Sequence, residues 1–184
     1  MAAPLPIFRY HPDPVATGSL KASADRCVCC GQSRGYIYTG PVYAEQEHEE
    51  DICPWCIADG SAHEQLGAEF TDRAAVGDNE GKWPPVSAAV AEEVAYRTPG
   101  FSGWQQERWV TCCDDAAAFI GRAGTKEVAV HGPALAEALR NELGWDDGPD
   151  WQNYYRALSS NDEPTAYLFR CLHCNKVNGY SDFT

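Results

Sequence analysis

The sequences Cys27-Val-Cys-Cys-Gly31 and Cys53-Pro-Trp-Cys56 decide how the first part of the chain folds, because each contains a Cys-x-x-Cys pair. A pair with this spacing lets both sulfurs reach one ion from a single tight turn. Gly31 suits such a turn, since glycine adopts a left-handed backbone at little cost. Between the pairs, residues 35–39 and 41–43 are rich in Tyr and β-branched residues and predict a short hairpin. We therefore expect a zinc-ribbon-like module in which four cysteines hold a structural Zn²⁺ ion: Cys27, Cys30, Cys53 and Cys56.

Two other interpretations of these four cysteines stay open. Cys53-Pro-Trp-Cys56 could be a redox dithiol of the thioredoxin type, although that motif begins a helix after a strand, and the chain here is acidic and hairpin-like. Four cysteines could also hold an iron–sulfur cluster, although their spacing matches neither ferredoxin pattern. Cys29 lies beside two of the ligands and needs no role beyond packing or facing solvent.

A third pair, Cys171 and Cys174, lies near the C-terminal end and needs partners from elsewhere. The adjacent Cys112 and Cys113 are the candidates, but neighbouring residues can both bind one ion only where the backbone is irregular. We expect these four cysteines, Cys112, Cys113, Cys171 and Cys174, to form a second zinc site. A histidine, His173 or His131, could replace Cys112 as fourth ligand. The alternatives are reduced buried thiols or a disulfide, which would be unusual in a reducing compartment.

The chain as a whole predicts an α+β fold. Residues 1–26 contain four prolines and predict an extended, ordered arm, whereas residues 57–85 show little periodicity and predict a loop or linker. We place a division there. Residues 1–85 then form the arm and the zinc-ribbon-like module, and residues 86–184 form a small α+β part, unless both belong to one continuous domain.

The second part contains the clearest secondary-structure signals. Apolar residues at helical spacing predict amphipathic helices over residues 86–97 and 133–143, and a third from residue 151 to 158 with Asp150 as its cap. Residues 166–183 predict a strand, a cysteine knuckle and a second strand. The same reasoning gives Asn175 the left-handed turn conformation that Gly31 has in the first pair.

The charge balance limits the partners. Twenty-seven acidic residues face 14 basic ones, so the net charge is −13 and the chain repels phosphate backbones. We therefore expect no nucleic-acid partner. No secretory signal or membrane span is visible, and nine cysteines, an odd number, argue against a complete disulfide framework. These features predict a cytoplasmic protein with no span in the membrane.

No arrangement of His, Ser, Cys or acidic residues predicts catalysis, so we expect binding rather than an enzyme. Two segments are candidate binding surfaces. The acidic group of Glu45, Glu47, Glu49, Glu50 and Asp51 is either a solvated loop or a docking surface for a basic partner. The group of Trp104, Gln105 and Gln106 is either part of the core or a recognition surface.

Several motifs resemble the CbrC family across nearly the whole chain: YHPDP at 10–14, CVCC at 27–30, CPWCIADGS at 53–61, GWQQE at 103–107 and LFRCLHC at 168–174. The resemblance implies a bacterial protein linked to colicin tolerance, with an immunity-like role against toxins. One departure concerns the second site, because relatives typically read Cys where this chain has Ala117, and His where it has Cys112.

We therefore expect a zinc-binding, non-catalytic protein that acts through protein–protein binding. A basic toxin is the partner that the resemblance and the charge together favour. The alternative is an enzyme or thiol-redox protein of unknown reaction that uses the cysteines outside the first zinc site.

Overall fold

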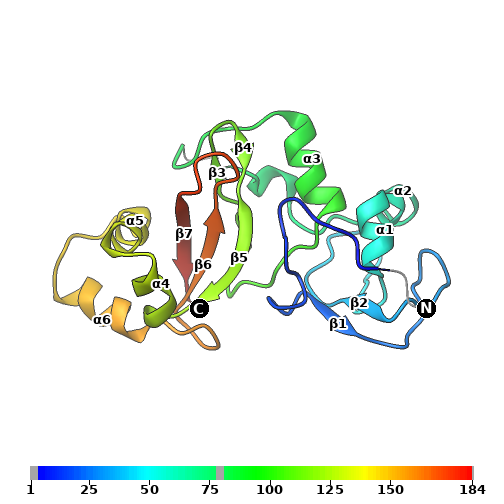
Figure 1. Cartoon of the computed structure of the whole chain (residues 1–184), viewed down its shortest axis with the longest axis horizontal. Coiled ribbons are helices and arrows are strands. Elements are labelled where there is room, and N and C mark those ends of the chain that lie inside the picture. Colours follow the sequence, from blue (N-terminus) through cyan, green and yellow to red (C-terminus); the bar gives the residue numbers. More distant parts are fainter. Residues whose placement is uncertain (1–3, 78–80, 184) are drawn as a thin grey trace.

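The computed structural model describes residues 4–77 and 81–183, and it confirms a mixed α and β fold (Figure 1). The strands are β1 (Leu20–Ala22), β2 (Tyr36–Tyr38), β3 (Thr111–Cys112), β4 (Asp115–Ala116), β5 (Ala118–Ala123), β6 (Thr165–Arg170) and β7 (Val177–Asp182). The helices are α1 (Pro54–Asp59), α2 (Ser61–Leu66), the 3₁₀ turn η1 (Arg73–Ala75), α3 (Ala88–Arg97), α4 (Thr125–Val130), α5 (Pro133–Leu143) and α6 (Pro149–Ala157). In Figure 1, β1, β2, α1 and α2 lie at one end, the β5–β6–β7 sheet with α4 to α6 lies at the other, and α3 lies between.

The N-terminal end is built around a two-stranded sheet. β1 pairs antiparallel with β2, with Leu20 opposite Tyr38 and Ala22 opposite Tyr36. Ile37 and Ile57 are buried in the core beneath it. Cys53 is the N-cap residue of α1, and Pro54 occupies the first helical position, where its missing N–H costs no hydrogen bond.

The hairpin that we expected over residues 35–43 is wrong, and with it the close likeness to a zinc ribbon. β2 pairs with the earlier strand β1, so the Cys27 turn lies in the connection between these strands. Tyr43 instead forms an isolated bridge with Glu69. The local pattern identified a strand correctly, but it did not specify which segment would pair with that strand.

The loop predicted over residues 57–85 is also wrong in part, because α1 extends to Asp59, and α2 and η1 lie within it. Gly60 and Gly67 adopt positive φ angles of 85° and 65° and end α1 and α2 after six residues each. Helices this short are difficult to recognise from periodicity. Residues 78–80 of the expected loop lie outside the described residues.

The C-terminal sheet confirms the predicted strand, knuckle and strand. β6 lies in the centre and pairs antiparallel with β5 and β7. One face of β6 packs Ala166 and Leu168 against the helices, with Val128, Leu135 and Leu139. The other face buries Tyr167 and Phe169 in an aromatic core that also contains Phe101, Trp109, Phe119 and Tyr180.

The three predicted helices are present as α3, α5 and α6. Ser87 caps α3 by accepting a hydrogen bond from the Val90 N–H, and Gly144 ends α5 with a φ of 71°. The cap of α6 differs from the prediction, because Gly148 is the N-cap residue and Asp150 lies in the first turn. The division that we placed at residue 85 stays a prediction.

The proline-rich N-terminal segment lies on the rest of the protein as expected. The Tyr10 carbonyl accepts a hydrogen bond from the Phe119 N–H of β5. His11 is fully buried, with Nδ1 2.7 Å from the Pro99 carbonyl and Nε2 2.6 Å from Thr17 Oγ1. Burial lowers the pKa of His11 to about 4, so the ring is neutral in the folded protein at neutral pH.

This buried ring makes stability depend on pH. The pKa of His11 rises to about 6.5 on unfolding, so between pH 6.5 and 4 the unfolded chain binds a proton that the folded chain does not. The free energy of unfolding should fall through this window by up to about 1.4 kcal/mol per pH unit from this residue. His11→Asn should be less stable than the wild type at pH 7.5. Its free energy of unfolding, measured with urea, should fall less steeply between pH 6.5 and 4. Parallel pH profiles would contradict the assignment.

Candidate metal centres

The first cluster brings together four thiols whose sulfurs all lie within 4.8 Å of one another. The Sγ atoms of Cys27 and Cys56 are 3.8 Å apart, those of Cys30 and Cys53 are 3.8 Å apart, and those of Cys53 and Cys56 are 3.6 Å apart. A Zn²⁺ ion with four Zn–S bonds of about 2.3 Å places its sulfurs about 3.8 Å apart. No disulfide joins these cysteines, all of which are free. The donor set and spacing therefore fit zinc.

Two different local structures supply the ligands of this first centre. Cys27 and Cys30 lie in a turn closed by hydrogen bonds from Gly31 N–H to Cys27 O and from Cys27 N–H to Gln32 O, and Gly31 has the expected positive φ of 67°. Cys53 and Cys56 lie at the start of α1. The Cys53 N–H donates to Cys27 Sγ at 3.3 Å, which links the two halves.

The second cluster contains the four cysteines predicted for it. All four Sγ atoms lie within 4.8 Å of one another, with 3.6 Å between Cys112 and Cys113 and 3.8 Å between Cys112 and Cys174. Cys113 and Asp114 form the two-residue turn between β3 and β4, with φ angles of 56° and 60°. This left-handed turn is the irregular backbone that lets adjacent cysteines approach one point.

The two Cys-x-x-Cys turns of Cys27 and Cys171 have the same backbone pattern. The Asn175 N–H donates to Cys171 O and the Cys171 N–H donates to Lys176 O. In the first turn, the Gly31 N–H donates to Cys27 O and the Cys27 N–H donates to Gln32 O in the same way. Asn175 has the predicted positive φ, 60°. The same turn therefore occurs twice in the chain, once between β1 and β2 and once between β6 and β7.

One thiol of each cluster is held close to the thiolate form that a metal requires. A hydrogen bond from the Cys53 thiol and several backbone N–H groups lower the pKa of Cys27 to about 4, against the effect of burial. Burial raises the pKa of Cys171, but the backbone N–H groups of Cys174 and His173 outweigh it and lower the pKa to about 6. Each is the first cysteine of its turn.

His173 lies between two of these cysteines but is engaged elsewhere. Its Nε2 lies 2.8 Å from the buried carboxylate of Asp115, which also accepts hydrogen bonds from Arg9 at 2.6 Å and Tyr10 at 2.8 Å. Burial raises the pKa of Asp115, but the hydrogen bonds of His173 and Tyr10 and the Arg9 charge lower it overall. Asp115 thus connects the N-terminal arm, the β3–β4 hairpin and the Cys171–Cys174 turn. Sequence reasoning missed it, because its partners are 58 to 106 residues away.

The predicted acidic surface lies in the loop before Cys53, and its glutamates are exposed. Glu50 forms an ion pair with Lys21, and Asp51 lies 3.0 Å from His48, whose side chain is buried. These contacts fix the end of the loop nearest the first centre. Glu45, Glu47 and Glu49 project into solvent from the rest of it.

The predicted Trp104 surface is tied to the C-terminal sheet. The Trp104 indole N–H donates to Thr165 Oγ1, although the residue remains 38% exposed. Gln105 donates through Nε2 to the Phe183 carbonyl, and Gln106 donates to Asp72. The amides therefore serve contacts within the chain.

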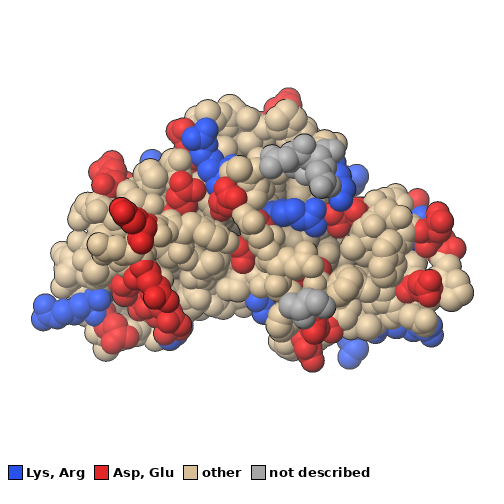
Figure 2. All heavy atoms as spheres, turned by 180° about the vertical axis from the view of Figure 1, so that it is seen from behind, with Lys and Arg blue, Asp and Glu red and all other residues tan. Residues whose placement is uncertain are grey.

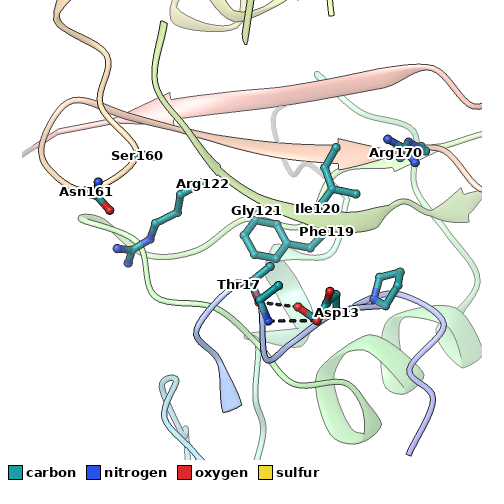
Figure 3. A pocket seen from close by; sticks show the side chains of 11 residues that line it. Asp13, Thr17, Phe119, Ile120, Gly121, Arg122, Ser160, Asn161 and Arg170 are labelled. Atoms are coloured by element: carbon teal, nitrogen blue, oxygen red, sulfur yellow. Dashed lines mark hydrogen bonds between the residues drawn. The ribbon is translucent and has the colours of Figure 1, made fainter. Parts of the chain in front are cut away.

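A hollow of about 550 Å³ lies away from both clusters (Figure 3). The turn from Asp13 to Thr17 forms one wall and β5 forms another, and Arg122 and Arg170 lie at separated places along it. A β-bulge between Phe119 and Gly121 interrupts β5 at this point. The lining comes from four separate segments of the chain, so no sequence motif marked it. Arg122 already donates to the Ser102 carbonyl, which limits its freedom to bind an anion.

The charges on the surface are mixed. Figure 2 shows one face, on which acidic and basic side chains are interspersed. The Lys and Arg side chains visible on this face form no continuous stripe. Among the described residues, no helix is long and apolar enough to cross a membrane.

The fold and these clusters define a class: a small mixed α and β protein with two groups of four cysteines that could hold metal ions. Within it, the chain belongs to the uncharacterised protein family UPF0167, whose family model matches residues 5–183. UPF0167 proteins of Mycobacterium bovis and Mycobacterium tuberculosis are each 53% identical over 185 residues, which covers 97% of this chain and 94% of theirs. A UPF0167 protein of Pseudomonas aeruginosa is 45% identical over 185 residues and is covered completely. No solved structure matches the chain.

The assignment to the CbrC family is therefore wrong, because the family model and the curated relatives identify a different family, UPF0167. The motifs that suggested CbrC are present in the chain, but they do not identify it as a member of that family. The colicin-tolerance and immunity-like roles rested on this resemblance and lose their support with it.

The Asp115 cluster gives a stability prediction. Asp115→Asn keeps the shape of the side chain but removes the charge that Arg9, Tyr10 and His173 share. We expect a loss of about 2 kcal/mol in urea unfolding, since hydrogen bonds to a buried charged group contribute about this much. Asp114→Asn is the matched control, because this neighbour is exposed and Asn tolerates its positive φ. Equal unfolding curves for both variants would contradict a central role for Asp115.

Proposed function

We propose that the protein is a non-catalytic, metal-stabilised binding protein in which both four-cysteine groups hold Zn²⁺. The observation that carries this proposal is the presence of two groups of four free thiols whose sulfurs all lie within 4.8 Å of one another. Four thiolates and a closed coordination shell are typical of structural zinc sites.

The arrangement of the cysteines supports binding over thiol-redox chemistry. All nine cysteines lie in the described residues, and Cys29 alone stands outside both clusters. A redox dithiol needs two sulfurs, whereas Cys29 Sγ contacts the Ser61 hydroxyl at 3.6 Å. The enzyme or thiol-redox alternative would therefore have to use thiols of the second cluster in place of a metal.

The exposed acidic loop supports a protein partner with a basic surface. Its far end is attached through the Tyr43–Glu69 bridge, and its near end leads into the buried Cys53. A loop that is fixed at both ends loses less entropy on docking than a free one does. With a net charge of −13, the protein also attracts basic partners over a distance.

Zinc content tests the metal assignment directly. Elemental analysis after purification without added metal should give two zinc ions per chain. Cys53→Ser and Cys174→Ser should each remove one, and Cys29→Ser should keep both. Cys53→Ser should also disorder the N-terminal end, since a structural zinc supplies on the order of 10 kcal/mol or more of folding free energy in small modules. A folded, reduced and metal-free wild type would rule out the assignment.

Charge removal tests the acidic loop. Replacing Glu45, Glu47, Glu49 and Glu50 by Gln should leave the zinc content unchanged and the melting temperature nearly so, because exposed charge pairs contribute only about 0–1 kcal/mol. Proteins captured by the wild type from a bacterial lysate should be depleted with this variant, as measured by quantitative mass spectrometry.

The matched control removes the same number of charges at the other end of the molecule. It replaces the exposed residues Glu137, Asp146, Asp147 and Asp150 by the corresponding amides, Gln or Asn. If the control loses the same proteins, net charge and not the loop governs binding.

A further inference from the structure

The two clusters differ in their access to solvent. In the first, Cys27, Cys53 and Cys56 are 1–2% exposed. In the second, Cys171 is buried, but Cys113 and Cys174 are exposed and Cys112 is partly so. A solvent molecule or small ligand can therefore reach the sulfurs of the second cluster without any unfolding of the chain. In the first cluster, Cys30 alone is partly exposed, so a competing ligand has a much narrower approach to its sulfurs.

A hollow of about 200 Å³ lies beside the second cluster. Cys112, Cys113 and Cys171 form part of its lining, together with Lys82 and Lys176. This volume is below the 300–1,000 Å³ typical of drug-sized pockets, so it accommodates only a small ligand or the end of a larger one. The route to the sulfurs is therefore open but narrow.

Two lysines place positive charge beside this hollow in a chain with few lysines. The sequence contains four lysines, and two of them line it. Lys82 is held by the carboxylate and carbonyl of Glu142, whereas Lys176 is exposed and forms no ion pair with another described residue. Four thiolates around Zn²⁺ leave a net charge of about −2, which repels anions unless a cation lies close by.

We propose that the zinc of the second centre is exchangeable, and that small anionic thiol or carboxylate chelators remove or deliver it through this hollow under the attraction of Lys176. This inference rests on the proposed function, since it requires zinc in both clusters. Each step exchanges one ligand: a Zn–ligand bond forms, a Zn–S bond breaks, and the cysteine sulfur leaves with the electron pair and takes a proton from water. The zinc stays divalent, so no oxidant or reductant is needed.

The experiment follows zinc release from the full-length protein into excess 4-(2-pyridylazo)resorcinol, an anionic chelator that absorbs light when it binds zinc. We expect one equivalent to leave at least tenfold faster than the other. Cys174→Ser should contain one zinc and show only the slow phase. A single phase for both equivalents would overturn the inference and leave the proposed function intact, whereas a wild type with only one zinc would overturn the second centre itself.

Lysine variants test the steering. Lys176→Gln should slow the fast phase several-fold, and Lys176→Arg should restore it. Lys126→Gln is the matched control, because Lys126 is exposed on α4 and does not line the hollow. With neutral 1,10-phenanthroline, the wild type and Lys176→Gln should release zinc at similar rates. Equal rates for Lys176→Gln and the wild type with the anionic chelator would overturn the role of Lys176.

Discussion

The convergence of four thiols at one point constrains this protein more than any single apolar contact. Each cluster joins segments that are far apart in sequence: the first brings Cys27 to the start of α1, and the second brings the β3–β4 turn to the turn between β6 and β7. Thiolates at 3.6–3.8 Å repel one another. In the second cluster, burial and the hydrogen bonds of neighbouring thiols raise the pKa of Cys112, whereas backbone N–H groups lower the pKa of Cys171 to about 6. A divalent cation removes that repulsion, and it repays the entropy of closing the long loops between the ligands.

The second cluster also positions structure beyond its ligands. β6 and β7 are joined by the Cys171 turn, so its location fixes one end of the C-terminal sheet. Asp115 then connects this end to the N-terminal arm through Arg9 and Tyr10. The arm continues to the buried His11 and to β5. A chain of polar contacts thus runs from the second cluster along the arm toward the N-terminal end of the molecule.

The sequence was informative wherever the controlling signal is local. The left-handed turns at Gly31 and Asn175, the helix stop at Gly144 and the four prolines of the arm are set by the conformational limits of single residues. It was uninformative where pairing is long-range. β2 pairs with β1 across the connection that contains the Cys27 turn, and the pattern of residues 35–43 does not indicate this partner. Pro54, by contrast, was an available signal for a helix start, and it distinguishes Cys53-Pro-Trp-Cys56 from a knuckle within a hairpin.

Charge gives the two centres different chemical situations. Zinc bound by four thiolates adds negative charge to a chain that already carries −13, so anions and phosphate backbones are repelled from most of the molecule. At the first centre this repulsion and the burial of three cysteines would act together to protect a bound metal from anionic competitors. At the second centre, Lys176 places a positive charge close to exposed sulfurs. Solvent access and local charge, and not the ligands themselves, govern the rate at which a competing ligand reaches a metal. The same set of four cysteines can therefore suit a permanent structural ion at the first centre and an accessible ion at the second.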